Sequence, residues 1–183
     1  EANPPPPLEG GFRAVPGLFS ANRVDAGSRL LAESLPAGLK GVAADFGAGW
    51  GYLSVKLAES APEVTAVDLY DAGFSACEAA RANMAALAPR IAARVFWRDL
   101  LSEKPERRYD AVVMNPPFHQ GRAAEPSIGE GMIRAAAAAL KPGGRLFLVA
   151  NRGLPYEAAL RAGFSRHGEL RRDARFKVLW AER

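Results

Sequence analysis

The chain has 183 residues, of which 49% are hydrophobic, and this is the size and composition of a folded domain, not of a disordered segment. The net charge of +4 permits an anionic partner without requiring one, and the single cysteine, Cys77, excludes an internal disulfide. No apolar run approaches the length of a membrane span and no signal peptide is recognisable, so the sequence predicts a soluble cytoplasmic protein.

The beginning of the chain is expected to lead into the domain. Pro4 to Pro7 form a polyproline tract, so residues 1–15 are predicted to be a linker or an extended segment. Pro16 to Ser20 are predicted to form a turn before a helix over residues 25–35. The domain itself is therefore expected to cover residues 16–183.

From residue 42 onward the predicted strands and helices alternate. Short apolar runs indicate strands, and longer alanine-rich stretches, one of which carries Cys77 as a small buried residue, indicate helices. This alternation predicts an α/β fold with a parallel sheet. The last two strands lie too close in sequence for a helix between them, so they are predicted to pair antiparallel as a hairpin. The predicted strands cover residues 42–46, 63–67, 93–97, 111–114, 145–150, 164–170 and 176–181.

A glycine-rich loop, DFGAGWG, separates the first strand from the helix that follows it. Glycines let the backbone turn tightly and approach a ligand, and the free N–H groups of a helix start face outward, as in nucleotide sites. The spacing disfavours NAD, because Tyr52 stands where a dinucleotide motif needs a small residue. The residues predicted to bind the cofactor are Asp45, Gly47, Ala48, Gly49 and Gly51, with bracing of the loop as the alternative role of Asp45.

Two acidic residues follow the next predicted strands. Asp68 is predicted to end the second strand, where its carboxylate would accept both hydroxyls of a ribose. Asp99 follows the third strand and is predicted to accept from an adenine amino group, with a helix cap or a surface acid as the alternative. The glycine loop and these acids together indicate a nucleoside-bearing cofactor.

The fourth strand ends abruptly at Asn115, Pro116, Pro117 and Phe118. The two prolines restrict φ and remove two N–H donors, so the strand cannot continue. The Asn115 amide oxygen and the Pro116 carbonyl are then acceptors for one exocyclic amine, and Phe118 offers a flat face beside them. This arrangement predicts a site for a planar amine or amide, with an ordinary strand-to-helix turn as the alternative.

These motifs make the chain similar to the class I S-adenosylmethionine-dependent methyltransferases, over nearly its whole length. More narrowly, it resembles the catalytic half of the ribosomal RNA guanine-N2 methyltransferases. The segments that carry this resemblance are Pro16–Ser20, Asp45–Gly51, Asn115–His119, Val149–Asn151 with Leu154–Tyr156, and Arg175–Val178.

The resemblance implies a Rossmann-like fold with a seven-stranded, mostly parallel sheet that ends in an antiparallel hairpin. It also implies S-adenosylmethionine as the cofactor and methyl transfer, without a metal, to the N2 amine of a guanine in small-subunit ribosomal RNA. In that family the Asn-Pro-Pro-Phe motif holds the target amine, which assigns Asn115 to Phe118 as catalytic and His119 as a substrate-binding neighbour. A second, degenerate domain usually precedes the catalytic domain of the family, so the resemblance implies a missing N-terminal partner domain.

The C-terminal end is basic, with eight Lys or Arg residues against four Asp or Glu residues from Arg152 onward. Arg171, Arg172 and Arg175 are predicted to contact RNA phosphates, with a solvated strand face as the alternative. Two other functions stay open at this point: methylation of adenine N6 or of a protein glutamine, and a non-catalytic module that binds cofactor or RNA.

Overall fold

A computed structural model describes residues 6–17, 21–117 and 126–183. The strands are β1 (Lys40–Phe46), β2 (Glu63–Asp71), β3 (Ala92–Trp97), β4 (Tyr109–Met114), β5 (Leu140–Asn151), β6 (Arg166–Arg172) and β7 (Phe176–Glu182). The helices are the short 3-10 helix η1 (Glu9–Gly11) and the α-helices α1 (Ala26–Ser34), α2 (Tyr52–Ser60), α3 (Phe74–Leu87), α4 (Ser127–Ala139) and α5 (Glu157–Gly163).

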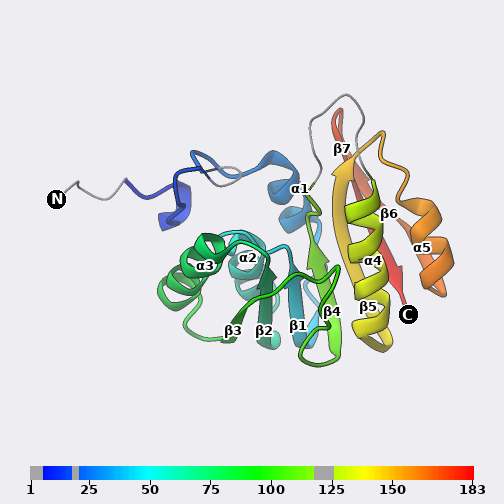
Figure 1. Ribbon diagram of the computed structural model, residues 1–183, viewed down its shortest axis with the longest axis horizontal. Coiled ribbons are helices and arrows are strands. Elements are labelled where there is room, and N and C mark those ends of the chain that lie inside the picture. Colours follow the sequence, from blue (N-terminus) through cyan, green and yellow to red (C-terminus); the bar gives the residue numbers. More distant parts are fainter. Residues whose placement is uncertain (1–5, 18–20, 118–125) are drawn as a thin grey trace.

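The seven strands form one sheet in the order β3-β2-β1-β4-β5-β7-β6. Strands β1 to β5 pair in parallel, whereas β7 pairs antiparallel with both β5 and β6. Figure 1 shows the arrow of β7 running against that of β5. The predicted mostly parallel sheet with a C-terminal hairpin is therefore confirmed.

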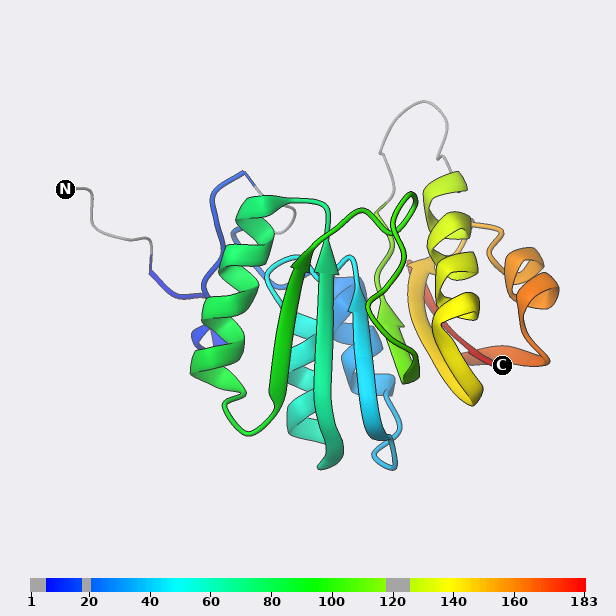
Figure 2. The ribbon, with the colours of Figure 1, turned by 60° about the horizontal axis from the view of Figure 1, so that its bottom comes forward.

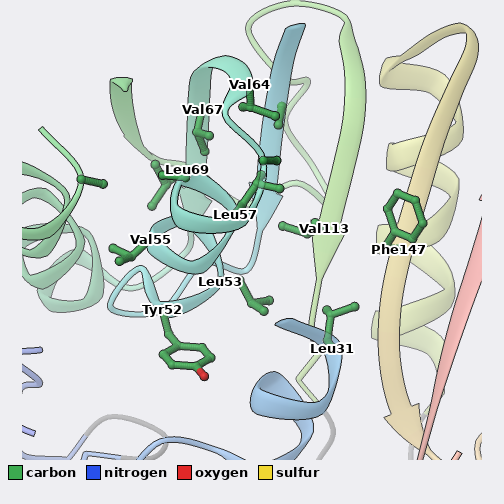
Figure 3. Packing of buried hydrophobic residues seen from close by; sticks show 14 of the residues in the cluster. Leu31, Tyr52, Leu53, Val55, Leu57, Val64, Val67, Leu69, Val113 and Phe147 are labelled. Atoms are coloured by element: carbon green, nitrogen blue, oxygen red, sulfur yellow. The ribbon is translucent and has the colours of Figure 1, made fainter. Parts of the chain in front are cut away.

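Two hydrophobic cores cover the two faces of this sheet. Along β4, the side chains of Ala111 and Val113 enter one core with α1, α2 and α3, while those of Val112 and Met114 enter the other with α4 and α5. Figure 3 shows side chains of the first core, and Figure 2 shows α4 and α5 at the β5 end of the sheet, away from α3 beside β3. A strand that is buried on both faces is a continuous apolar run, which explains why β4 was recognisable in the sequence.

The carboxyl ends of β1 and β4 lie side by side, because Phe46 at the end of β1 is the register partner of Met114 at the end of β4. The chain passes from β1 to β2 and β3 on one side, and then returns to β4 on the other side of β1. Ligands of open α/β sheets bind where the strand order reverses in this way. The glycine loop after Phe46 and the Asn-Pro-Pro turn after Met114 therefore meet at one edge of the sheet.

The prediction that the second strand ends at Asp68 is wrong. Strand β2 continues to Asp71, and Asp68 lies within it, opposite Arg94 of β3. The Asp68 carboxylate is completely buried and accepts two hydrogen bonds from Arg94, two from Arg107 and one from the Tyr109 hydroxyl, all between 2.8 and 3.0 Å. Burial raises the pKa of Asp68, but these hydrogen bonds outweigh the effect and hold the pKa below its usual value.

The N-terminal segment packs against the domain at Phe12 and Arg13, and the assignment of residues 1–15 as a linker or an extended segment stays a prediction. Phe12 is buried, with its ring centroid 5.1 Å from that of Trp50. The buried side chain of Asn83 accepts a hydrogen bond from the Arg13 N–H and donates to the carbonyls of Arg13 and Trp50. The segment is thereby joined to the start of α2 and to α3.

The described part of the chain contains no helix with the length and apolar character that a membrane crossing requires. Cys77 is buried in α3, as its small neighbours predicted.

Because Asp68 holds two guanidinium groups and a phenol, Asp68→Asn should lower the free energy of unfolding by about 1–3 kcal/mol, the scale for hydrogen bonds to a charged acceptor. Urea unfolding at pH 7 measures this loss. The matched control is Glu59→Gln, which removes an exposed ion pair with Lys56 and should change stability by less than about 1 kcal/mol. Equal stability of the Asp68 variant and the wild type would contradict the structural role of this carboxylate.

Candidate functional site

A cavity of about 310 Å³ opens at the edge where β1 and β4 end. Its walls come from α1, the glycine loop, the start of α2, the end of β2, α3 and the Asn-Pro-Pro turn. The lining residues are Asp25, Ser28, Gly47, Ala48, Gly49, Trp50, Tyr52, Leu53, Asp71, Ala76, Asn115, Pro116 and Pro117. Three of the five glycine-loop residues predicted to bind the cofactor, and three residues of the strand-tip motif, are thus brought together.

The glycine loop reaches the cavity through its backbone. The N–H groups of Gly47 and Ala48 both donate to the Tyr70 carbonyl at 2.9 Å, which fixes the loop against the end of β2. Gly47 has φ 72° and Gly49 has φ 55°, values that residues with side chains rarely adopt. Gly51 does not line the cavity; it is buried and starts α2 with φ 91°, so its role in the structure is to form the turn.

Asp71 occupies the position at the end of β2 that was predicted for Asp68. Its Oδ2 accepts a hydrogen bond from the Gly49 N–H at 2.8 Å, and its Oδ1 accepts one from the Gly73 N–H at 2.8 Å. Each carboxylate oxygen has a further lone pair, so Asp71 can accept hydrogen bonds from a pair of hydroxyls in the cavity. The Asp68 carboxylate, bound to Arg94 and Arg107, is not among the lining groups.

A second cavity of about 290 Å³ adjoins the first and shares Gly47, Asp71 and Pro117 with it. Asp99 lines this second cavity, where its Oδ1 accepts a hydrogen bond from the Leu101 N–H at 3.0 Å. One carboxylate oxygen of Asp99 thus stabilises the turn after β3, and the side chain is exposed. Its contact with an adenine amine stays a prediction.

Asp45 lies beneath the glycine loop and does not line the cavity. Its carboxylate is fully buried, Oδ2 accepts a hydrogen bond from the Ser54 hydroxyl at 2.7 Å, and Oδ1 has no hydrogen-bond partner among the described residues. Burial raises the pKa of Asp45 to about 7, although the Ser54 hydrogen bond opposes the shift. The contact with Ser54 of α2 favours the bracing role, and an orienting role toward the cofactor stays a prediction.

Asn115 is half-buried at the tip of β4 and faces α1. Its Nδ2 donates to the Asp25 carboxylate and to the Ser28 hydroxyl, each at 2.9 Å. The two amide hydrogens are therefore used within the protein, and the amide oxygen is left as an acceptor. Phe118 and His119, which were also predicted to contact the substrate, lie outside the described residues.

The basic hairpin ends at the same edge of the sheet, because Phe176 at the start of β7 pairs with Asn151 at the end of β5. The three predicted phosphate-binding residues are exposed, but each has a partner. Arg171 lies 3.5 Å from Glu33, Arg172 lies 2.7 Å from Glu169, and the Arg175 guanidinium lies 5.1 Å from the centroid of the Phe176 ring. Their contact with phosphates stays a prediction.

Sequence reasoning missed seven of the lining residues, and Asp25, Ser28 and Asp71 are the missed residues that form hydrogen bonds at the cavity. The signal for Asp71 was present, since Leu69 and Tyr70 continue the apolar run of β2 beyond Asp68. No local signal linked Asp25 or Ser28 to Asn115, because 87 or more positions of sequence separate them.

Comparison with known proteins places this geometry among methyltransferases. The sequence model of the methyltransferase small domain family matches residues 9–180. Two curated relatives are ribosomal RNA small subunit methyltransferases C. The protein from Yersinia enterocolitica is 38% identical over 92% of this chain and 48% of its own length, and the protein from Hamiltonella defensa is 40% identical over 93% and 49%. The chain thus spans about half the length of these relatives.

A solved structure of the T. thermophilus 16S rRNA N2 G1207 methyltransferase, RsmC, in complex with AdoMet and guanosine is 34% identical to the chain, with a TM-score of 0.79. The match covers 93% of this chain and 46% of that protein. The S-adenosylmethionine-dependent methyltransferase SibL, at 21% identity and a TM-score of 0.66, shares the fold.

The buried Asp45 carboxyl should make stability fall with rising pH. Its pKa in the folded chain, about 7, lies above the ordinary value of 3.8, so the folded state binds the proton more tightly between these two values. Stability should therefore decrease from about pH 4 to about pH 7, by at most about 4 kcal/mol, since one pKa unit corresponds to about 1.4 kcal/mol. Urea unfolding of Asp45→Asn should lack this contribution, and parallel pH curves for the wild type and the variant would contradict it.

Proposed function

The chain belongs to the methyltransferase small domain family, and on this basis we propose that it transfers a methyl group from S-adenosylmethionine to the N2 amine of a guanine in small-subunit ribosomal RNA. The observation that carries the proposal is the Asn115 amide, whose nitrogen is held by α1 while its oxygen accepts no hydrogen bond from the described residues and lies at the edge of the cavity. The relatives that share this half of their length are named as ribosomal RNA methyltransferases, and the solved complex holds AdoMet and guanosine.

The two adjoining cavities suit an extended cofactor made of an amino acid, a ribose and an adenine. The backbone of Gly47 to Gly49 lines the first cavity, Asp71 lies between the two, and Asp99 lines the second. In the proposed assignment the loop accommodates the sulfonium and amino-acid part, Asp71 accepts from the ribose hydroxyls, and Asp99 accepts from the adenine amine.

The chemistry needs an acceptor site because the N2 lone pair of guanine is delocalised into the ring and is a poor nucleophile. The site has to align the amine with the sulfonium methyl, and alignment of this kind supplies most of the catalysis. The Asn115 amide oxygen and the Pro116 carbonyl each accept a hydrogen bond from one N–H group of the guanine amine. They thereby stabilise the positive charge that grows on its nitrogen as the methyl transfers. The methylated nitrogen then releases its proton to water, so neither a metal nor a dedicated base is needed.

The RNA has to present the guanine out of any helix, because its amine cannot reach the strand tip within a stacked duplex. The exposed arginines of the hairpin, Arg171, Arg172 and Arg175, lie at the same edge as the site and are our candidates for contact with the flanking phosphates. RNA, as ribosomal RNA or within the small subunit, is thus the proposed partner.

Asn115→Ala should lower turnover by about a hundredfold or more, the scale for loss of one preorganised charge-stabilising group, and should leave cofactor affinity nearly unchanged. The measurement is methyl transfer to ribosomal RNA from labelled cofactor, followed by mass spectrometry of the nucleosides. The expected product is N2-methylguanosine. Label recovered as N6-methyladenosine, or only in protein, would exclude the proposed substrate while leaving the methyltransferase family intact.

Asp71→Asn should weaken S-adenosylmethionine binding by about 1.5–3 kcal/mol, since the amide leaves one oxygen where the carboxylate offers two charged acceptors. Calorimetry on the free protein measures this change. The matched control is Asp68→Asn, three positions earlier in the same strand, which should bind the cofactor as the wild type does. Loss of affinity in the Asp68 variant and not in the Asp71 variant would reverse the assignment.

A further inference from the structure

We infer that Asp25 and Ser28, at the start of α1, are positioning residues that hold the Asn115 amide in one orientation, with its oxygen toward the substrate amine. This inference rests on the proposed function, in which Asn115 accepts a hydrogen bond from that amine. It adds α1, which precedes the whole sheet in sequence, to the parts of the chain that determine which substrates react.

The orientation of the amide follows from the partners of its nitrogen. Asn115 Nδ2 lies 2.9 Å from Asp25 Oδ2 and 2.9 Å from Ser28 Oγ. A carboxylate can only accept hydrogen bonds, so the edge of the amide that faces Asp25 has to be the NH₂ group. Rotation of the amide by half a turn would place its oxygen against the carboxylate, so that Asp25 would lose the hydrogen bond from Asn115 and the amide NH₂ group would lose both of its acceptors, at a cost of about 1–3 kcal/mol for unsatisfied groups.

The Asp25 carboxylate is itself fixed by the helix. Its Oδ2 also accepts a hydrogen bond from the Ser28 N–H at 2.8 Å, which caps α1. The helix in turn packs against β7 through the buried Gly27, where an added Cβ atom would lie 3.1 Å from the Phe176 ring and 3.1 Å from Asp25 Oδ2. The carboxylate therefore has a defined position relative to the sheet and, through Asn115, relative to the strand tip.

The chemical consequence is selectivity for nucleophiles that carry N–H bonds. With its NH₂ group used by α1, Asn115 offers only an oxygen, and the Pro116 carbonyl beside it offers only an oxygen. An amine donates to both acceptors, whereas an amide that presented its own NH₂ group would repel the amine and the positive charge that develops on it. Because the positive charge develops only in the transition state, loss of the correct amide orientation should lower kcat.

The test compares substitutions in α1 that separate its cap from its contact with Asn115. Asp25→Ser retains a residue type that caps helices well, but the side chain is too short to reach Asn115 as well. Ser28→Ala removes the second acceptor. Each variant should lower kcat for guanine methylation about tenfold, the scale of one hydrogen bond, while the affinity for S-adenosylmethionine stays within about twofold.

Two further variants serve as rescue and control. Asp25→Asn keeps an oxygen that can accept from both the Ser28 N–H and Asn115, so it should recover kcat to within a few-fold of the wild type. Ser34→Ala removes a hydroxyl that donates to the Leu30 carbonyl in the last turn of the same helix, away from Asn115, and should leave kcat unchanged.

Nuclear magnetic resonance of the Asn115 side-chain amide gives a readout that does not depend on activity. Its two N–H resonances, assigned by their absence in Asn115→Ala, should exchange slowly with water in the wild type and faster in Asp25→Ser and Ser28→Ala. If the wild type does not methylate guanine, the proposed function fails and this measurement still decides the orientation of the amide. Unchanged exchange and kcat in both variants, or a loss of kcat that is matched by loss of cofactor affinity, would overturn the positioning role.

Discussion

The parallel pairing of β1 with β4 is the contact on which the site depends. Phe46 lies opposite Met114, so two loops that are 68 residues apart in sequence leave the sheet side by side. One loop brings its glycine backbone against the cavity, and the other ends in an amide oxygen and a carbonyl that two prolines hold in place. The cofactor cavity and the acceptor site are adjacent for this reason, and any shift in this register would separate them.

Two carboxylates in β2 illustrate how strand geometry assigns different tasks to similar residues. Successive side chains of a strand point to opposite faces, so Asp68 and Asp71, three positions apart, cannot face the same way. The Asp68 side chain accepts hydrogen bonds from Arg94, Arg107 and Tyr109 on one face of the sheet. Asp71, at the end of the strand, accepts a hydrogen bond from the glycine loop instead. A carboxylate whose oxygens are all engaged by ion pairs is unsuited to bind a ligand. A carboxylate that accepts one backbone hydrogen bond at each oxygen can still accept hydrogen bonds from a ligand.

The N-terminal elements take part in the site although they lie outside the alternating strands and helices. Asn83 joins Arg13 to the Trp50 carbonyl, and the start of α1 holds the Asn115 amide. The glycine loop and the strand tip are therefore each supported by the chain that precedes β1. Catalysis by alignment requires such support, because a displaced acceptor loses much of its effect on the reacting amine.

The sequence alone determined four features: the alternation of strands and helices, the terminal hairpin, the glycine loop and the Asn-Pro-Pro turn. Each arises from local properties, namely apolar periodicity, proline geometry and the conformational freedom of glycine. Only the tertiary structure decided where β2 ends, that Phe12 is buried, and that Asn115 forms hydrogen bonds with Asp25 and Ser28. These features depend on which face a side chain takes and on contacts between residues that are distant in sequence. Such contacts leave no periodic or compositional trace in the segments that make them.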